Sequence, residues 1–214
     1  MKKTVLLLHG LGRTGVSMRG LARYLEREGL TARCWDYASR KRTMHQLADD
    51  LVDFVASFPE EDGLWAVSHS LGGILVRLTT ERINWNGAVM LAPPNQGSVV
   101  ARWCRDRIWY QRLFGPAGQA MADPSRWPDP PHPCGIIAGK GGFSISNPTS
   151  IIARKVMPKS EHEMSDGTLT VDETRCAGVE DHVTIKASHT WIMNHPETKR
   201  LVSHYIAEGC FPVS

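Results

Sequence analysis

Short apolar runs alternate along the chain with longer stretches in which apolar residues recur every three or four positions. The runs at residues 4–8, 64–67 and 87–91 are typical of strands buried on both faces of a parallel sheet. Residues 18–25 and 44–58 have the spacing of amphipathic helices. This alternation with short connections predicts right-handed βαβ units, and therefore an α/β fold whose mostly parallel sheet is covered by helices on both faces.

The remaining pattern extends this prediction to about six strands. Further strands are expected at residues 31–37, 135–139 and 179–187, and a last helix is expected to begin at His195-Pro196. Thr43 and Gln46 have the spacing of a capping box at the start of the second helix. Residues 140–164 are long and polar, and we expect them to form an irregular loop.

Residues 97–134 interrupt the alternation of strands and helices. Tryptophans and arginines occur together in this stretch, which ends in several prolines. Two interpretations fit this stretch: surface helices that bury their aromatic side chains, or a cap that lines a substrate pocket. At 214 residues with 42% hydrophobic content, the chain is long enough for one sizeable core. We therefore expect residues 1–214 to form a single domain, with 97–134 as a cap insertion after the fourth strand.

Charge and cysteine content exclude several classes of protein. The formal net charge is +3, with 25 basic and 22 acidic residues interspersed, so no basic block suited to nucleic acid or an anionic membrane is present. The basic cluster at Arg40–Arg42 is expected to form a solvated turn. The first apolar run is too short for a signal peptide, and no later run is long enough for stable insertion into a bilayer. With five scattered cysteines as well, we expect a cytoplasmic protein.

The candidate chemistry centres on residues 64–73, where a strand-like run meets a turn of small residues and then a helix-like stretch. Ser70 lies at the turn, and Ser68 and Gly72, two positions away on each side, are small enough for the backbone to reverse sharply. The turn also places Ser70 at the N-terminus of a helix, where free N–H groups favour negative charge. Such a turn can present a serine hydroxyl as a nucleophile.

Three more segments place candidate functional residues beside predicted strands. His9-Gly10-Leu11-Gly12 follows the first strand, Ser165-Asp166-Gly167 precedes the sixth, and Ser188-His189 comes after it. Together with Ser68-His69-Ser70-Leu71-Gly72-Gly73, they arrange the candidate residues along the chain in the order serine, acid, histidine. In these motifs the chain resembles the α/β-hydrolase fold over essentially its whole length, and it is most similar to the small esterase/lipase branch, whose compact members lack the first two strands of the larger fold.

The resemblance implies a role for each matching residue. Ser70 would be the nucleophile, His189 the general base, and Asp166 the acid that orients the imidazole. The backbone amides of Leu11 and Leu71 would stabilise the oxyanion, with His9, Gly10 and Gly72 in supporting positions. His9 would shape the oxyanion loop through hydrogen bonds or have a purely structural role. The implied activity is the hydrolysis of a small-molecule carboxylic ester through an acyl-enzyme, without a cofactor.

Other residues compete for these roles. Ser68 is a second serine at the turn, Asp172 and Asp181 are alternatives to Asp166, and His69, His182 and His195 are alternatives to His189. A cation could bind at Glu161-His162-Glu163 or at His132, although no pair of histidines has helical metal-ligand spacing, so no metal is expected. The same triad would also serve a thioesterase, an amidase or an acyltransferase, and a catalytically silent hydrolase-like binding protein is a further alternative. The oligomeric state is left open.

Overall fold

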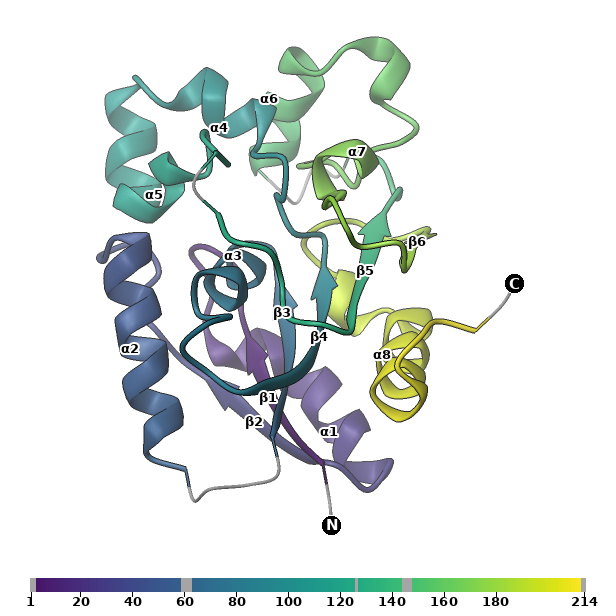
Figure 1. The fold of residues 1–214 in the computed structure, drawn as a ribbon. Coiled ribbons are helices and arrows are strands. Elements are labelled where there is room, and N and C mark those ends of the chain that lie inside the picture. Colours follow the sequence, from purple (N-terminus) through teal and green to yellow (C-terminus); the bar gives the residue numbers. More distant parts are fainter. Residues whose placement is uncertain (1–2, 59–62, 126, 144–147, 213–214) are drawn as a thin grey trace.

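A single sheet of six parallel strands organises the fold, with the strand order β2-β1-β3-β4-β5-β6 (Figure 1). The computed structural model describes residues 3–58, 63–125, 127–143 and 148–212. The predicted α/β class and parallel sheet are confirmed. The strands are β1 (Thr4–Leu8), β2 (Thr31–Trp35), β3 (Leu64–His69), β4 (Trp85–Leu91), β5 (Cys134–Gly139) and β6 (His182–Ile185).

Helices cover both faces of the sheet because each central strand sends alternate apolar side chains to opposite sides. From β1, Leu6 and Leu8 join the core under α2 and α3, whereas Val5 and Leu7 join the core under α1 and α8. All four side chains are fully buried. The helices are α1 (Arg19–Arg27), α2 (Met44–Ala56), α3 (Leu71–Leu78), α4 (Val99–Cys104), α5 (Ile108–Ala120), α6 (Pro148–Val156), α7 (Val171–Thr174) and α8 (Pro196–Glu208).

Local signals at helix ends are as predicted. The Thr43 side chain accepts a hydrogen bond from the Gln46 N–H, and the Gln46 side chain accepts one from the Thr43 N–H, so the capping box starts α2. His195 is the N-cap of α8, and Gly209 ends that helix in a left-handed conformation. Strands β2 and β6 are shorter than expected, as their predicted outer residues lie in the adjoining turns.

The prediction that residues 140–164 form an irregular loop is wrong. Residues 148–156 form α6, and Lys159–Glu161 form a turn of 3₁₀-helix, while residues 144–147 lie outside the described part of the chain. Ala153 and Met157, four residues apart, are both buried in the larger core. Ile151, by contrast, is 53% exposed, so the apolar residues of this segment do not mark one buried face that would reveal a helix from sequence.

Helices α4 to α7 gather beyond the carboxyl ends of the strands (Figure 1). At Gly115 the backbone of α5 leaves the helical conformation, with φ of 64°. A methyl group at Gly115 would lie 1.8 Å from the Arg40 carbonyl oxygen, so only glycine allows this close approach. The contact fixes α5 against the loop between β2 and α2, and it holds the Arg40 backbone in place.

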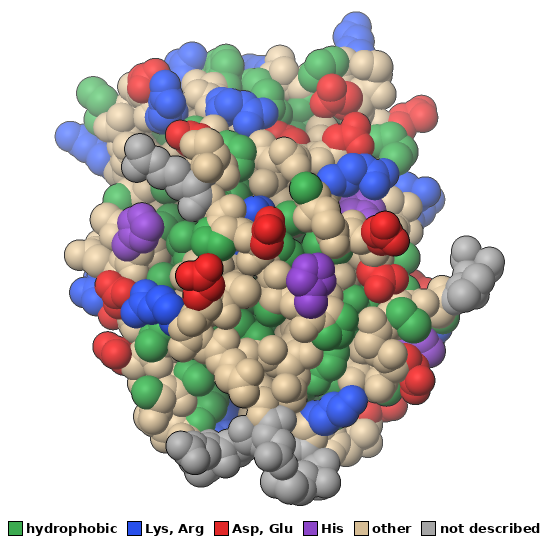
Figure 2. Space-filling model, in the orientation of Figure 1, with side chains coloured by type: hydrophobic (Ala, Val, Ile, Leu, Met, Phe, Trp, Pro, Cys, Tyr) green, Lys and Arg blue, Asp and Glu red, His purple; other side chains and the backbone are tan. Residues whose placement is uncertain are grey.

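The surface shows no concentration of one charge on the face seen in Figure 2, where basic and acidic side chains are interspersed. No helix within the described ranges is long and apolar enough to cross a membrane.

Candidate active site

Ser70 occupies a sharp turn between β3 and α3. Its φ of 51° and ψ of −118° are rare for a residue with a side chain, and such strain persists only where the surroundings enforce it. The Ser70 N–H donates to the Leu91 carbonyl oxygen on β4 at 2.9 Å. A methyl group at Gly72 would lie 2.9 Å from Leu8 Cβ, so this glycine lets α3 pack closely on the end of β1. The turn therefore projects Ser70 from the carboxyl edge of the sheet.

The structure brings Ser70, His189 and Asp166 together in one hydrogen-bonded chain. The Ser70 Oγ atom lies 3.1 Å from His189 Nε2, and His189 Nδ1 lies 2.7 Å from Asp166 Oδ2. Ser70 and His189 are each 8% exposed, whereas Asp166 is 1% exposed. With Nδ1–H donating to the carboxylate, His189 Nε2 is free to accept the proton of the serine hydroxyl.

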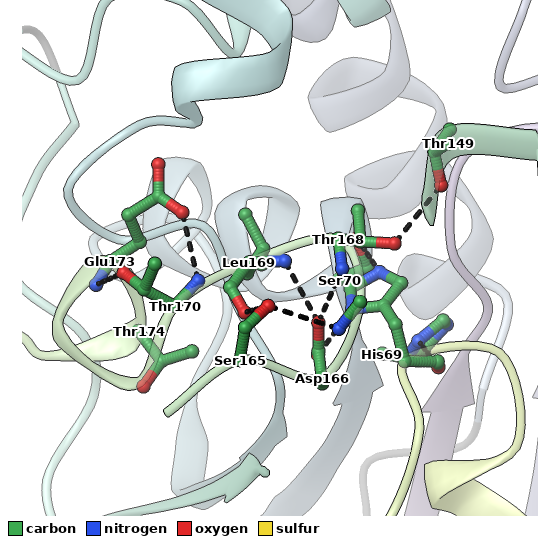
Figure 3. A network of polar contacts seen from close by, with 12 residues as sticks. His69, Ser70, Thr149, Ser165, Asp166, Thr168, Leu169, Thr170, Glu173 and Thr174 are labelled. Atoms are coloured by element: carbon green, nitrogen blue, oxygen red, sulfur yellow. Dashed lines mark hydrogen bonds and ion pairs between the residues drawn. The ribbon is translucent and has the colours of Figure 1, made fainter. Parts of the chain in front are cut away.

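A tight turn after Asp166 determines which of its oxygens faces His189. Asp166 Oδ1 accepts hydrogen bonds from the backbone N–H groups of Thr168 and Leu169, at 2.9 and 2.8 Å, and Oδ2 remains for the imidazole (Figure 3). The His189 N–H also donates to the Asp166 carbonyl oxygen at 2.9 Å. The Ser165 hydroxyl bridges the same turn, since it donates to the Leu169 carbonyl oxygen. These bonds orient the carboxylate before any substrate binds.

Leu11 and Leu71, the residues predicted to supply oxyanion donors, both lie near the nucleophile: Leu71 follows Ser70 directly, and Leu11 lines the same cavity as Ser70. Leu71 is the first residue of α3, so its N–H has no intrahelical acceptor. The Leu11 N–H donates no hydrogen bond to any other described residue. A methyl group at Gly10 would lie 2.6 Å from His69 Nδ1 and 3.3 Å from Ser70 Cβ, so glycine is needed for this loop to lie beside the serine.

His9 holds the loop that carries Leu11. Its Nδ1–H donates to the Gly10 carbonyl oxygen at 2.8 Å, its Nε2 accepts from the Tyr37 N–H at 3.3 Å, and its ring stacks on Tyr37 at 4.0 Å. Burial lowers the pKa of His9, which keeps the ring neutral in this role. His9 lies outside the chain formed by Ser70, His189 and Asp166, in agreement with a role in shaping the loop.

The competing residues lie away from this chain. The Ser68 hydroxyl is buried within β3. Asp172 is largely exposed and pairs with Arg175, and Asp181 accepts a hydrogen bond from Tyr205. Finally, two rival histidines bond elsewhere: the His182 ring to the Thr174 hydroxyl, and the His195 ring to the Glu197 N–H.

His69, the third histidine considered as an alternative to His189, has its ring against that of His189 at 4.9 Å and lines the cavity. Burial, followed by the neighbouring charge of His189, lowers the pKa of His69 well below its usual value. The neutral ring donates from Nε2 to the His189 carbonyl oxygen at 3.0 Å. His69 thus positions the backbone of His189. This contact could not be predicted from sequence, because 120 residues separate His69 from His189.

A cavity of about 370 Å³ opens at Ser70. Its apolar wall comes largely from α4 and α5, and its charged groups are Arg13 and Arg40, neither of which was identified from sequence as part of a site. Arg40 is exposed, as expected for a solvated turn, but it also contributes to the cavity. Apolar lining residues are Leu11, Val100, Ala101, Tyr110, Leu113, Phe114 and Met121.

The aromatic side chains of residues 97–134 differ in their surroundings. Tyr110 and Phe114 line the cavity, and Tyr110 is buried. Trp103 and Trp109 are 46% and 45% exposed and do not line it.

Glu173 is a further residue that sequence analysis missed. It accepts hydrogen bonds from the N–H groups of Val99, at the start of α4, and of Thr170, as part of a capping box (Figure 3). Burial raises the pKa of this carboxyl. The Thr170–Glu173 spacing is the signal that could have predicted α7. Through Glu173, α7 holds the base of α4 beside Ser98, a cavity residue.

The sites considered for metal binding carry no cluster of ligands. His162 Nε2 lies 3.2 Å from the Met157 carbonyl oxygen, and its ring packs edge-on against Phe143. Across the described residues, no three histidine, cysteine or acidic side chains are grouped to hold a metal ion.

The architecture is similar to that of several solved structures, although comparisons of the sequence itself found no match. No protein-family model matches the chain, and no curated protein matches it in sequence. The mature form of the Bacillus licheniformis lipase BlEst2 is similar, with a TM-score of 0.73 and 16% identity over 96% of this chain and 91% of that one. A metagenomic carboxyl esterase, MGS0156, has a TM-score of 0.72 and 17% identity over 97% of this chain and 76% of its own. Polyneuridine aldehyde esterase has a TM-score of 0.61 and 13% identity over 97% of this chain and 100% of its own.

Proposed function

Since the chain has the α/β-hydrolase fold, we propose that it is a serine hydrolase that cleaves carboxylic esters, with Ser70 as nucleophile, His189 as general base and Asp166 as orienting acid. The observation that carries the proposal is the hydrogen-bonded chain from Ser70 Oγ through His189 to Asp166, with distances of 3.1 and 2.7 Å, at the mouth of a cavity. The esterases and a lipase among the similar structures support a reaction at an ester.

In the first half of the reaction, Ser70 Oγ attacks the ester carbonyl carbon while His189 Nε2 accepts the hydroxyl proton. The carbonyl oxygen becomes an oxyanion that accepts hydrogen bonds from the Leu11 and Leu71 N–H groups, each contributing about 3 kcal/mol to the transition state. The carbon–oxygen bond to the alcohol then breaks, and His189 returns its proton to the departing alcohol oxygen.

In the second half, His189 Nε2 accepts a proton from water, whose oxygen attacks the acyl carbon. A second oxyanion forms against the same two N–H groups. As it collapses, the bond from the acyl carbon to Ser70 Oγ breaks and His189 returns its proton to that oxygen, which releases the carboxylic acid and restores Ser70. Asp166 stays ionised throughout and stabilises the imidazolium. We propose that residues 97–134 act as a cap, whose Tyr110, Leu113 and Phe114 contact the acyl chain. The five free thiols favour a reducing compartment such as the cytoplasm.

The experiment is the hydrolysis of nitrophenyl esters of graded acyl length by the parent protein, Ser70→Ala and Ser68→Ala. Ser70→Ala should lower kcat about 10⁴-fold or more, because it removes the nucleophile. Ser68→Ala removes a hydroxyl two residues away on β3 and should keep activity. Turnover by folded Ser70→Ala at the parent rate would refute the proposal. Thioester and amide analogues of the best substrate then test the thioesterase and amidase alternatives.

A further inference from the structure

Two arginines line the cavity beside Ser70, and neither is neutralised. Within the described part of the chain, no carboxylate lies within 4.0 Å of the guanidinium of Arg13 or of Arg40. The cavity lining contains no acidic residue.

Arg13 is the more enclosed of the two. Its Nε atom is buried and has no hydrogen-bond partner among the described residues. Burial also lowers the pKa of Arg13. An N–H donor left unsatisfied in this way costs free energy that an incoming acceptor would recover. Arg13 therefore lacks the counter-ion that a purely structural arginine at such a position would have.

The positions of the two arginines indicate which part of a substrate they meet. The Arg13 guanidinium lies over the Trp191 ring at 5.9 Å, two residues after His189. His189 is the group that would protonate the departing alcohol, and the contact with Trp191 is the ground on which we assign Arg13 to the alcohol side of Ser70. The Arg40 Cδ atom lies 3.7 Å from the Cβ position at Gly12, on the oxyanion loop. The apolar wall from α4 and α5 is left for the acyl chain.

We propose that Arg13 and Arg40 form an anion-binding subsite, and that the preferred substrates are esters of apolar acids whose alcohol portion carries a carboxylate or a phosphate. A planar guanidinium donates two parallel hydrogen bonds to either group, which suits Arg better than Lys to this role. The inference rests on the proposed esterase function, because it assigns the alcohol side by the position of His189.

The test compares pairs of esters in which one member carries an anionic group and the other is its neutral counterpart. Butanoylglycerol 3-phosphate is paired with butanoylglycerol, and 4-carboxyphenyl butanoate with its neutral methyl ester, so the two pairs distinguish phosphate from carboxylate. The variants are Arg13→Gln, Arg40→Gln, the double variant and Arg13→Lys. Arg27→Gln, an exposed residue of α1 outside the cavity, is the control for net charge.

In the pair that the parent protein prefers, each Gln variant should raise KM for the anionic ester about ten times more than it raises KM for the neutral ester. The value of kcat should change little. The double variant should approach a hundredfold, and Arg13→Lys should recover part of the loss. Arg27→Gln should behave as the parent. Equal effects on charged and neutral esters, or a loss confined to kcat, would overturn the subsite.

Direct binding separates this inference from the proposed function. Calorimetric titration of Ser70→Ala with glycerol 3-phosphate and with 4-hydroxybenzoate measures affinity for the alcohol products without any turnover. We expect binding of at least one of them, weakened about tenfold by Arg13→Gln. Absence of binding to both would overturn the subsite even if neutral esters are hydrolysed. Anion binding without hydrolysis of any ester would instead count against the proposed function alone.

Discussion

Asp166→Asn replaces one carboxylate oxygen with an NH₂ group, and the hydrogen bonds around Asp166 determine the effect of this change. Asp166 Oδ1 accepts from the N–H groups of Thr168 and Leu169 at 2.9 and 2.8 Å. An asparagine must keep its oxygen at that position, because its NH₂ group would otherwise face two donors. The NH₂ group then faces His189 Nδ1, at the place of an oxygen now 2.7 Å away. The imidazole is thereby forced to carry its proton on Nε2, facing Ser70.

In that tautomer His189 cannot accept the serine proton. A comparable change in another serine hydrolase triad lowers turnover by roughly 10⁴-fold, which corresponds to about 5.4 kcal/mol of transition-state stabilisation. The fold should persist, since both bonds to the backbone N–H groups remain. The assay is kcat on a nitrophenyl ester, together with the midpoint of thermal unfolding.

Asp172→Asn is the matched control, because Asp172 is largely exposed and paired with Arg175. It should leave kcat within twofold of the parent, and so should Asp181→Asn. If Asp166→Asn kept kcat within tenfold of the parent while remaining folded, the reasoning from the Asp166 turn would be refuted. A large loss in Asp172→Asn would assign the acid to that residue instead.

Two further predictions follow from the packing around the site. Gly10→Ala should lower kcat/KM by about 10²-fold, as its methyl group would lie 2.6 Å from His69 Nδ1 and displace the oxyanion loop; parent-level activity would contradict this. Acidification should destabilise the fold, because burial lowers the pKa of both His9 and His69. Their contribution is complete above the unfolded value of about 6.5, and below it stability should fall by up to ~2.7 kcal/mol per pH unit. Urea unfolding at several pH values measures this, and a constant free energy of unfolding would count against it.

The central sheet and the Ser70 turn could be predicted because their signals are local. A strand such as β1, buried on both faces, is visible as an unbroken apolar run, and the turn needs small residues at fixed offsets from Ser70. Asp166 and His189 could be nominated from motif order, yet their distances to Ser70 depend on the whole sheet. His189 lies 119 residues from Ser70, a separation that no local pattern encodes.

The cavity's other members could not be predicted for the same reason. Arg13 and Arg40 belong to different loops and line one cavity, and α5, a third element, packs on the Arg40 backbone at Gly115. Helix α6 was missed because its apolar residues do not all lie on one buried face: Ala153 is buried, whereas Ile151 is 53% exposed. The likeness to esterases and a lipase was found in three dimensions, at 13 to 17% identity.

The most direct test of the central claim is to find which residue a serine-directed inhibitor labels covalently. The protein is treated with a fluorophosphonate, which phosphonylates an activated serine, and the adduct is located by peptide mass spectrometry. We predict one adduct, on Ser70, that is absent from Ser70→Ala and much slower to form in Asp166→Asn, while Ser68→Ala is labelled at the parent rate. A protein that hydrolyses esters but carries the adduct on another residue, or no adduct at all, would contradict the assignment of Ser70 as nucleophile.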